Sequence, residues 1–323
     1  MSKSMMMTMK FIPNSSLRIL VLTGLAATLI TCADSQQLAV PSEIYVNKSV
    51  SSPADIVQFN GKYVVSELYN NRLAILDDPT DQTPEYFDPA TIGKKFSSPH
   101  YLAVTPENTL LISNGWGNSI VEIKDLNGTG WKELRGTETE FWAPHGICVS
   151  GDGKIYIGDS LNSRLVRLDD MDGNGWKVFP DSHNQIAYIR QLTCKNNQVW
   201  ISNSYESNEG LNPGIGGNIL LLEDFDSGNI ASVFELPDAN FTAVMPLHDQ
   251  LLLGIWGNYS QIATIEQTAN PQLQLWGLDP NLGTPYSLQT FDAEDRHKYG
   301  AAMLGKLDPL PKEQTGGIVF FNF

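Results

Sequence analysis

Two histidines occupy the same place in two similar segments of the chain. His100 and His145 each follow a proline and precede a short apolar run. When the other similar segments are aligned with these two, the same position holds Ala54, Arg190 and Thr242. Imidazole nitrogens bind zinc and exchange protons near neutral pH. Brought together, His100, His145 and Arg190 could bind a ligand, an anion or a divalent metal such as zinc. The alternative is that both histidines are structural.

A second set of polar side chains comes at the end of the next strand expected in each segment. It consists of Glu67, Asn114, Asp159 and Asn203, with Ile255 in the fifth segment. In an antiparallel pair the end of one strand lies beside the start of the other, so we expect both sets on one face. These four residues are further candidates for ligand binding. They are also residue types that accept hydrogen bonds from backbone amides in turns.

The segments that carry these residues read as small antiparallel sheets. Residues 144–179 alternate apolar and polar positions and are interrupted by turn residues such as Asp152-Gly153, which predicts four short strands. Similar segments begin near residues 53, 99, 189 and 241, roughly 45 residues apart. A sheet this small cannot bury its own faces. Repeats of this period therefore predict blades arranged around an axis.

The pattern P-x-G-I-x-V, D-G, I-Y-I-x-D-S, N-x-R-L in residues 144–168 resembles the NHL repeat of six-bladed β-propellers. Residues 99–123 and 53–76 resemble it too, and the two later segments do so in outline, so that the resemblance covers about residues 53–264. It implies an all-β fold, a six-bladed β-propeller of four-stranded antiparallel blades. It implies little about function, because propellers include scaffolds, binders and enzymes.

A closed ring needs a last blade that pairs with the start of the chain. We expect residues 42–46 to form the outer strand of a composite blade with residues 286–323, beside the strand Gly317–Phe321. Residues 272–310 show little alternation, and Ala293–Leu307 looks helical. A ring of five or seven blades therefore stays open. Residues 32–323 are expected to form a single domain and a monomer.

The first 31 residues have the features of a secretion signal. Lys3, Lys10 and Arg18 precede an apolar run from Ile19 to Ile30, too short to span a bilayer comfortably. Leu29-Ile30-Thr31-Cys32 resembles a bacterial lipoprotein cleavage box, which implies that Cys32 becomes the lipidated first residue. Cleavage after Ala33, or an uncleaved anchor, is the alternative. We expect an exported protein on the periplasmic side of the cell envelope, with a lipid as its only membrane contact.

The other two cysteines could form a disulfide in such an oxidising compartment. Aligning the third and fourth repeats places Cys194 one position on from Cys148. Consecutive residues of a strand face opposite sides, so Cys148 could face the fourth blade while Cys194 faces the third. The alternative is two buried, reduced side chains.

The run Asp170-Met171-Asp172-Gly173-Asn174-Gly175, with Asp181 further on, has the ligand spacing of a calcium loop. The terminal ligand is Asp rather than Glu, and no flanking helices are expected. Asp and Asn followed by Gly are also what a tight turn needs. A turn and a calcium site are both compatible with this run.

These observations favour a binding or scaffolding module that uses the channel-mouth face. With 21 basic and 36 acidic residues, a net charge of −15 disfavours nucleic acid as a partner. A protein, peptide or carbohydrate fits better, since Trp116 and Trp256 could form an aromatic rim. The alternative is a metal-dependent hydrolase or lyase, because the chain also resembles gluconolactonase-like hydrolases and, in its P-H-G repeats, the peptidyl-hydroxyglycine lyase. Neither resemblance supplies a complete ligand set. A purely structural envelope protein is a third possibility.

Overall fold

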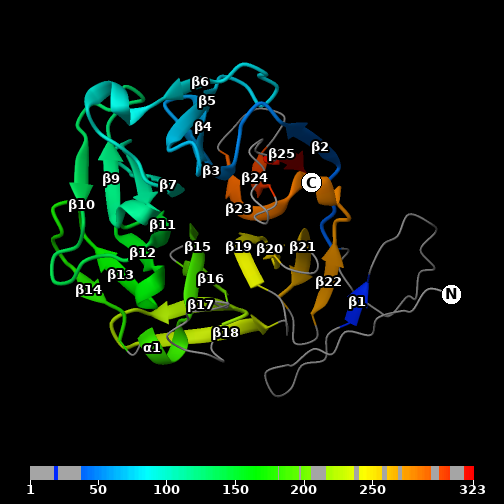
Figure 1. Cartoon of the computed structure of the whole chain (residues 1–323). Coiled ribbons are helices and arrows are strands. Elements are labelled where there is room, and N and C mark those ends of the chain that lie inside the picture. The colour runs from blue at the N-terminus through cyan, green and yellow to red at the C-terminus, as the bar shows by residue number, and fades with distance from the viewer. Residues whose placement is uncertain are drawn as a thin grey trace.

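The described residues form six small antiparallel sheets that stand side by side around a central axis (Figure 1). The computed structural model describes residues 18–20, 38–180, 182–195, 198–204, 216–235, 240–256, 260–267, 271–291, 298–305 and 316–323. Consecutive strands pair with each other inside each sheet. The chain is therefore a six-bladed β-propeller, as its repeats predict.

The first three blades contain four strands each, numbered from the axis outward. The first blade consists of β3 (Pro53–Phe59), β4 (Lys62–Glu67), β5 (Arg72–Leu76) and β6 (Glu85–Phe87). The second consists of β7 (Pro99–Val104), β8 (Leu110–Asn114), β9 (Ser119–Ile123) and β10 (Lys132–Leu134). The third consists of β11 (Pro144–Val149), β12 (Ile155–Asp159), β13 (Arg164–Leu168) and β14 (Lys177–Val178). Short 3-10 turns lie at η1 (Pro89–Ile92), η2 (Gly115–Gly117) and η3 (Ser160–Asn162).

The next two blades follow the same order. The short helix α1 (Ser182–Gln185) leads into the fourth blade. That blade consists of β15 (Tyr188–Lys195), β16 (Gln198–Ser204), β17 (Asn218–Asp224) and β18 (Asn229–Glu235). The fifth consists of β19 (Asn240–Leu247), β20 (Gln250–Trp256), β21 (Gln261–Glu266) and β22 (Gln272–Leu275). The strand β1 (Arg18–Leu20), which belongs to the predicted signal sequence, pairs in parallel with β22.

The last blade joins the two ends of the propeller. The turn η4 (Pro280–Leu282) precedes β23 (Thr284–Thr290), β24 (Tyr299–Leu304) and β25 (Gly316–Asn322). The outer strand is β2 (Glu43–Asn47), which pairs antiparallel with β25 from Glu43 opposite Asn322 to Asn47 opposite Ile318. The predicted closure by residues 42–46 is confirmed. The predicted helical stretch Ala293–Leu307 is wrong where it is described, because residues 299–304 form β24.

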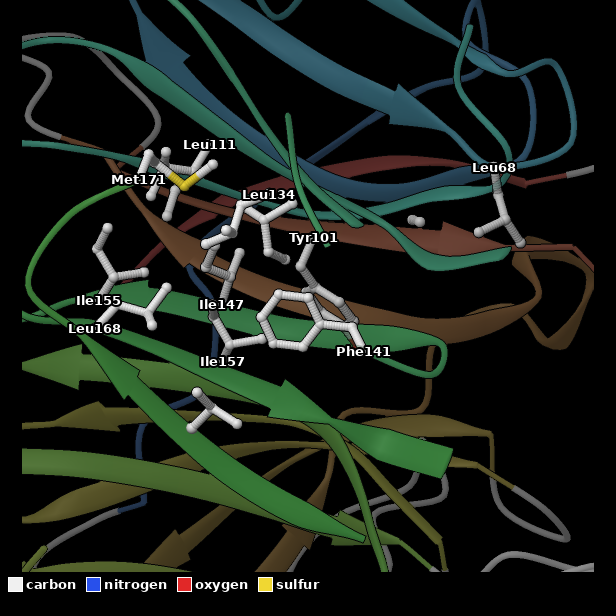
Figure 2. Close-up of a cluster of buried hydrophobic side chains, with 14 of the residues drawn as sticks. Leu68, Tyr101, Leu111, Leu134, Phe141, Ile147, Ile155, Ile157, Leu168 and Met171 are labelled. Carbon is white, nitrogen blue, oxygen red and sulfur yellow. The ribbon is translucent and has the colours of Figure 1, made fainter. Parts of the chain in front are cut away.

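Each blade is covered on both faces by its neighbours, so its inner strands are buried almost throughout. In β8 every residue is buried, and in β4 every residue except Lys62. Figure 2 shows one interface, where Ile147, Ile155 and Leu168 of the third blade meet Leu111 and Leu134 of the second. Burying one such side chain stabilises the fold by about 1.5–3 kcal/mol. The ring is held mainly by these contacts between blades.

The turns have the backbone geometry that their residue types predict. Between β3 and β4, Asn60 and Gly61 have φ values of 52° and 75°, as a two-residue hairpin of type I′ requires. In the run from Asp170 to Gly175, where a turn and a calcium site are both compatible with the sequence, the Asp170 carboxylate accepts hydrogen bonds from the backbone N–H groups of Asp172 and Asn174. These contacts are those of a turn. Asp181, the last ligand expected in a calcium loop, lies outside the described residues.

The two inner cysteines come together across a blade boundary. Cys148 of β11 and Cys194 of β15 are joined by a disulfide, with 5.6 Å between their Cα atoms. Cys32 and the rest of the predicted lipoprotein box lie outside the described residues. No helix among the described residues is long and apolar enough to cross a membrane.

Candidate functional site

The residues that align with the two histidines form a ring at one end of the axis. In each innermost strand the pairing with the next strand shifts after the first paired residues, which is typical of a β-bulge. In blade order, the residue that directly follows the last pair before this shift is Ala54, His100, His145, Arg190, Thr242 and Tyr286. The sixth position, Tyr286, escaped the repeat alignment. It follows Pro285, just as each histidine follows a proline, and this signal could have found it.

His100 and His145 pack against each other. Their ring centroids are 3.9 Å apart and both side chains are buried. Nδ1 of His100 lies 2.7 Å from the carbonyl oxygen of Ser98, and Nδ1 of His145 lies 2.9 Å from that of Ala143. A carbonyl oxygen can only accept, so Nδ1 carries the proton in both rings. Their Nε2 atoms are therefore acceptors.

Burial keeps both imidazoles neutral. It lowers the pKa of His100 to about 3, and the Arg190 guanidinium adds to this effect. Burial also lowers the pKa of His145 well below its usual value, helped by His100 and Arg190. The Nε2 atom of His145 accepts a hydrogen bond from the Tyr188 hydroxyl at 2.9 Å, which agrees with its tautomer. The pair can therefore accept hydrogen bonds at neutral pH, but it supplies no positive charge.

The histidine pair does not have the geometry of two ligands of one zinc ion. With Zn–N distances of about 2.0–2.1 Å and tetrahedral angles, the ring centroids of two ligands would be roughly 5 Å apart. The observed 3.9 Å is shorter. In addition, the described residues contain no group of three His, Cys, Asp or Glu side chains that could hold a metal ion. Metal binding by His100 and His145 stays a prediction from the sequence.

Aromatic side chains surround Arg190 at this end of the axis. Its guanidinium carbon lies 4.5 Å from the ring centroid of Tyr188, 5.4 Å from that of Trp256 and 5.9 Å from that of Tyr286. Its Nη1 donates a hydrogen bond of 3.3 Å to the Tyr286 hydroxyl. Burial raises the pKa of the Tyr69 phenol in the first blade, and Tyr286 and Arg190 are close enough to influence it as well. All six blades thus contribute to a channel-mouth cluster, defined as Tyr69, His100, His145, Tyr188, Arg190, Trp256 and Tyr286.

The second set of predicted ligands lies close by, but its polar atoms hold the chain that enters each blade. Asp159 accepts hydrogen bonds from the backbone N–H of Trp142 at 2.7 Å and from Arg164 Nε at 2.6 Å. Its equivalents make the same bond to the backbone in their own blades, Glu67 with Ser51, Asn114 with Ser97 and Asn203 with Ala187. All four side chains are buried. These contacts explain why a carboxylate or amide recurs at this position without any ligand.

The axis is filled behind the channel-mouth cluster. The Tyr101 side chain reaches across the axis, and its hydroxyl donates hydrogen bonds to the backbone carbonyls of Tyr286 at 2.8 Å and Thr242 at 3.2 Å. The side-chain amide of Gln191 bonds to both the N–H and the carbonyl of Leu288. At the opposite end lies a cavity of about 420 Å³, bordered by the disulfide and by Lys195. The two ends of the channel are therefore separate.

Asp55 is a buried carboxyl among the side chains that fill the axis, which we call the plug. Its Oδ2 accepts a hydrogen bond of 2.9 Å from the backbone N–H of Leu102, and both oxygens lie within 3.2 Å of Gln289 Nε2. Burial is the largest effect on its pKa, which rises to about 6 in spite of these hydrogen bonds. Asp55 belongs to the support of the site rather than to its exposed surface. Repeat alignment does not single it out.

The fold and the ring of residues at its axis define a six-bladed β-propeller. Within it, residues 141–168, in the third blade, match the family model of the NHL repeat. The NHL resemblance read from the sequence is therefore confirmed. No curated protein sequence matches the chain.

Three solved structures illustrate how widely this fold is shared. A gluconolactonase from Xanthomonas campestris is 13% identical, with a TM-score of 0.61 over 87% of this chain and 90% of its own. A catalytically inactive virginiamycin B lyase from Staphylococcus aureus with quinupristin is 16% identical, with a TM-score of 0.56 over 87% of this chain and 100% of its own. The WD40 repeats of RRP9 are 11% identical, with a TM-score of 0.58 over 88% and 99%. At these identities the likeness concerns the fold alone.

Proposed function

We propose that the protein is a binding module that takes a carbohydrate or peptide at the channel-mouth cluster. The observation that carries this proposal is the convergence of polar groups within a frame of aromatic rings. Arg190 lies among Tyr188, Trp256 and Tyr286, beside two neutral histidines. Ligand sites commonly combine apolar and aromatic walls with a few polar groups that fix orientation. His100 and His145 are buried, so a ligand would first meet Tyr69, Arg190 and Trp256, which are less buried.

A thermal-shift screen of monosaccharides, oligosaccharides and short peptides at pH 7.5 tests this proposal. We expect at least one compound to stabilise the wild type, and about tenfold weaker binding in Tyr69→Ala and Trp256→Ala. Lys177→Ala, in the outer strand of the third blade, is the control and should bind normally. Equal binding by all variants would show that the compound binds outside the channel-mouth cluster. If no compound in the screen stabilises the wild type, the proposal that the protein binds a carbohydrate or peptide is contradicted.

A hydrolase or lyase that acts at the same cluster is the second candidate. It is favoured by the Tyr188 hydroxyl, which lies 2.9 Å from Nε2 of a neutral His145, because Tyr and His are residue types that general acid–base catalysis uses. The fold is shared with a gluconolactonase and with virginiamycin B lyase, so gluconolactone and quinupristin are reasonable first substrates. Turnover lost in both His145→Gln and Tyr188→Phe would support this candidate. Turnover unchanged in the two variants would reject it.

We further propose that the protein is exported and anchored by a lipid on Cys32. Basic residues precede an apolar run that ends near Cys32, and a disulfide between Cys148 and Cys194 suits an oxidising compartment. Labelling with a radioactive fatty acid in a bacterial host should mark the wild type but not Cys32→Ser, and the variant should leave the membrane fraction. Equal labelling of both proteins would contradict the anchor.

A further inference from the structure

A basic pocket with an aromatic wall lies on the second blade. Its volume is about 520 Å³, within the range of roughly 300–1,000 Å³ that is usual for ligand sites. It is enclosed by the segment before β7, by the turn η2 after β8, and by the outer part of the blade around β10. We call it the blade-2 pocket, and its lining includes Lys94, Lys95, Trp116, Trp131, Glu133 and Arg135.

The charge of this pocket is opposite to that of the whole protein. Lys94, Lys95 and Arg135 line it together with a single acid, Glu133, in a chain with a net charge of −15. Arg135 is held in place by hydrogen bonds from Nη1 to the Gly117 carbonyl at 2.7 Å and from Nη2 to Glu133 at 2.8 Å. Among the described residues, neither Lys94 nor Lys95 takes part in an ion pair. The two lysines can therefore neutralise an anionic ligand.

Two tryptophans, Trp116 and Trp131, give the pocket an apolar side. Trp116 is 60% exposed, which is unusual for so large an apolar side chain. Trp131 stacks on Phe96 with 5.3 Å between ring centroids, and its buried indole N–H has no acceptor within the described part of the chain. Trp131 is therefore fixed by its stacking on Phe96 as one wall of the pocket, while Trp116 offers an exposed indole face to a ligand.

The pocket has a rigid wall that it shares with the channel mouth. The turn η2 is fixed by hydrogen bonds from Gly115 N to the Ser98 carbonyl at 3.0 Å and from Gly117 N to the Ser97 carbonyl at 3.2 Å. On its other side, a Cβ atom on Gly115 would lie 2.3 Å from Nδ1 of His100. Gly115 therefore lets η2 pack directly on the histidine. The pocket is preformed and adjoins the channel-mouth cluster, but it has its own lining.

We propose that the blade-2 pocket binds a short acidic saccharide, such as an oligomer of uronic acids. The C–H face of a sugar ring can stack on Trp116, and its carboxylates can pair with Lys94 and Lys95. Stacking on an exposed indole distinguishes this ligand from a simple inorganic anion. The site is independent of the function proposed for the channel mouth and goes beyond it.

Calorimetric titration with tri-galacturonate tests the proposal in the wild-type protein at low and at physiological salt. Trp116→Ala should weaken binding about tenfold, because stacking on the indole is lost. The double variant Lys94→Ala/Lys95→Ala should weaken it by at least about tenfold and reduce its salt dependence. Maltotriose, a neutral trisaccharide of similar size, should bind at least about tenfold more weakly than tri-galacturonate.

Two controls separate this site from the rest of the same protein. Trp142→Ala removes another exposed tryptophan, 48% accessible, and should leave tri-galacturonate binding unchanged. Tyr69→Ala alters the channel-mouth cluster and should also leave it unchanged. Absence of tri-galacturonate binding at millimolar concentration, equal binding of maltotriose, or equal loss in Trp142→Ala would overturn the proposal. Equally tight binding of tri-glutamate would overturn the saccharide assignment in favour of an acidic peptide.

Discussion

The imidazole ring of His100 lies against that of His145, with 3.9 Å between centroids, and both rings are buried and neutral. Protonating either ring would place a charge at the axis, next to Arg190. The pair is therefore a place where folding stability must depend on pH. The sign of this dependence follows from the direction of the two pKa shifts.

Stability should fall as the pH is lowered from about 6.5 towards 3. The unfolded chain binds a proton at His100 near pH 6.5, whereas the folded protein does so only near 3. The difference, 6.5 − 3 = 3.5 pKa units, sets an upper value of about 5 kcal/mol for His100. His145 acts in the same direction. Urea unfolding of the wild type and of His100→Gln between pH 7.5 and 4.5 measures the effect.

The variant should have a flatter stability curve, because it has lost one of the two groups that take up protons on unfolding. Glu107→Gln, at an exposed site, should run parallel to the wild type. A curve for His100→Gln parallel to that of the wild type would mean that His100 is already charged or accessible in the folded protein.

Asp55 should have the opposite effect on stability. Its folded-state pKa of about 6 lies above its usual 3.8, so the folded protein keeps the proton that the unfolded chain has lost. Stability from this group is present below about pH 4 and is lost as the pH rises through 6. The difference, 6 − 3.8 = 2.2 pKa units, corresponds to about 3 kcal/mol. The larger, opposite contribution of the histidines sets the net slope of the wild type.

Replacing Asp55 by Asn should therefore stabilise the protein at pH 7.5 by about 1–3 kcal/mol and change little at pH 4. An Asn oxygen can still accept from Leu102 N, and the amide of Gln289 can turn to accept from the new NH₂ group. Guanidinium unfolding at the two pH values checks this. A variant that is less stable at pH 7.5 would show that the ionised carboxylate is needed in the plug.

The fold could be predicted from the sequence because its signals are local and repeated. Turns such as Asn60-Gly61 and strands such as Ile155–Asp159 recur at a similar spacing, and the closing strand, residues 42–46, ends in the β-prone run Ile44-Tyr45-Val46. The last blade was harder. Its strand β24 contains Gly300-Ala301-Ala302-Met303, whose alanines and methionine favour helix, but every one of these residues is buried between neighbouring strands.

The site could be predicted only in part. Repeat alignment brings His100, His145 and Arg190 to one end of the axis, and the structure places them there. It does not single out Tyr188, although this residue lies only two positions before Arg190 in the same strand. Trp256 is expected at this face as part of an aromatic rim, but its place beside Arg190 depends on a contact between the fourth and fifth blades. The alignment also cannot distinguish a residue that binds a ligand from one that holds the backbone in place, and Asp159 is an example. Its recurrence suits both roles, and only its contacts with Trp142 and Arg164 show what it holds.

Asp159 should be important for the stability of the third blade. It is fully buried and forms an ion pair of 2.6 Å with Arg164, whose side chain is 10% exposed. Asp159→Ala removes the acceptor of Trp142 N and leaves the Arg164 charge without its partner, which should cost about 3–5 kcal/mol. Asp159→Asn keeps an acceptor for Trp142 N and should cost less. Thermal and urea unfolding of the two variants compare them.

As a matched comparison, Asp172→Ala removes the carboxylate of an exposed ion pair with Lys132 and should cost less than about 1 kcal/mol. If Asp159→Ala costs no more than this surface variant, Asp159 is not a structural residue. In that case its role as a ligand, as the sequence suggested, would regain support.

The bond between Cys148 and Cys194 should stabilise the contact between the third and fourth blades. The two residues are 46 positions apart, and closing a loop of this length restricts the unfolded chain by about 4 kcal/mol in the chain-entropy description. Measured values are commonly smaller, so we expect Cys148→Ala/Cys194→Ala to lose about 2–4 kcal/mol. Urea unfolding with and without dithiothreitol measures the loss, and the reductant should affect only proteins that contain both cysteines.

Counting free thiols separates this bond from simple packing of two apolar side chains. The Cys32→Ser protein, which lacks the third cysteine, should show no reactive thiol when it is purified from an oxidising compartment and unfolded without reductant. After reduction it should show two, at Cys148 and Cys194. Two reactive thiols before reduction would contradict the bond. A double variant as stable as the wild type would show that the blades hold together without it, because their apolar contact is sufficient.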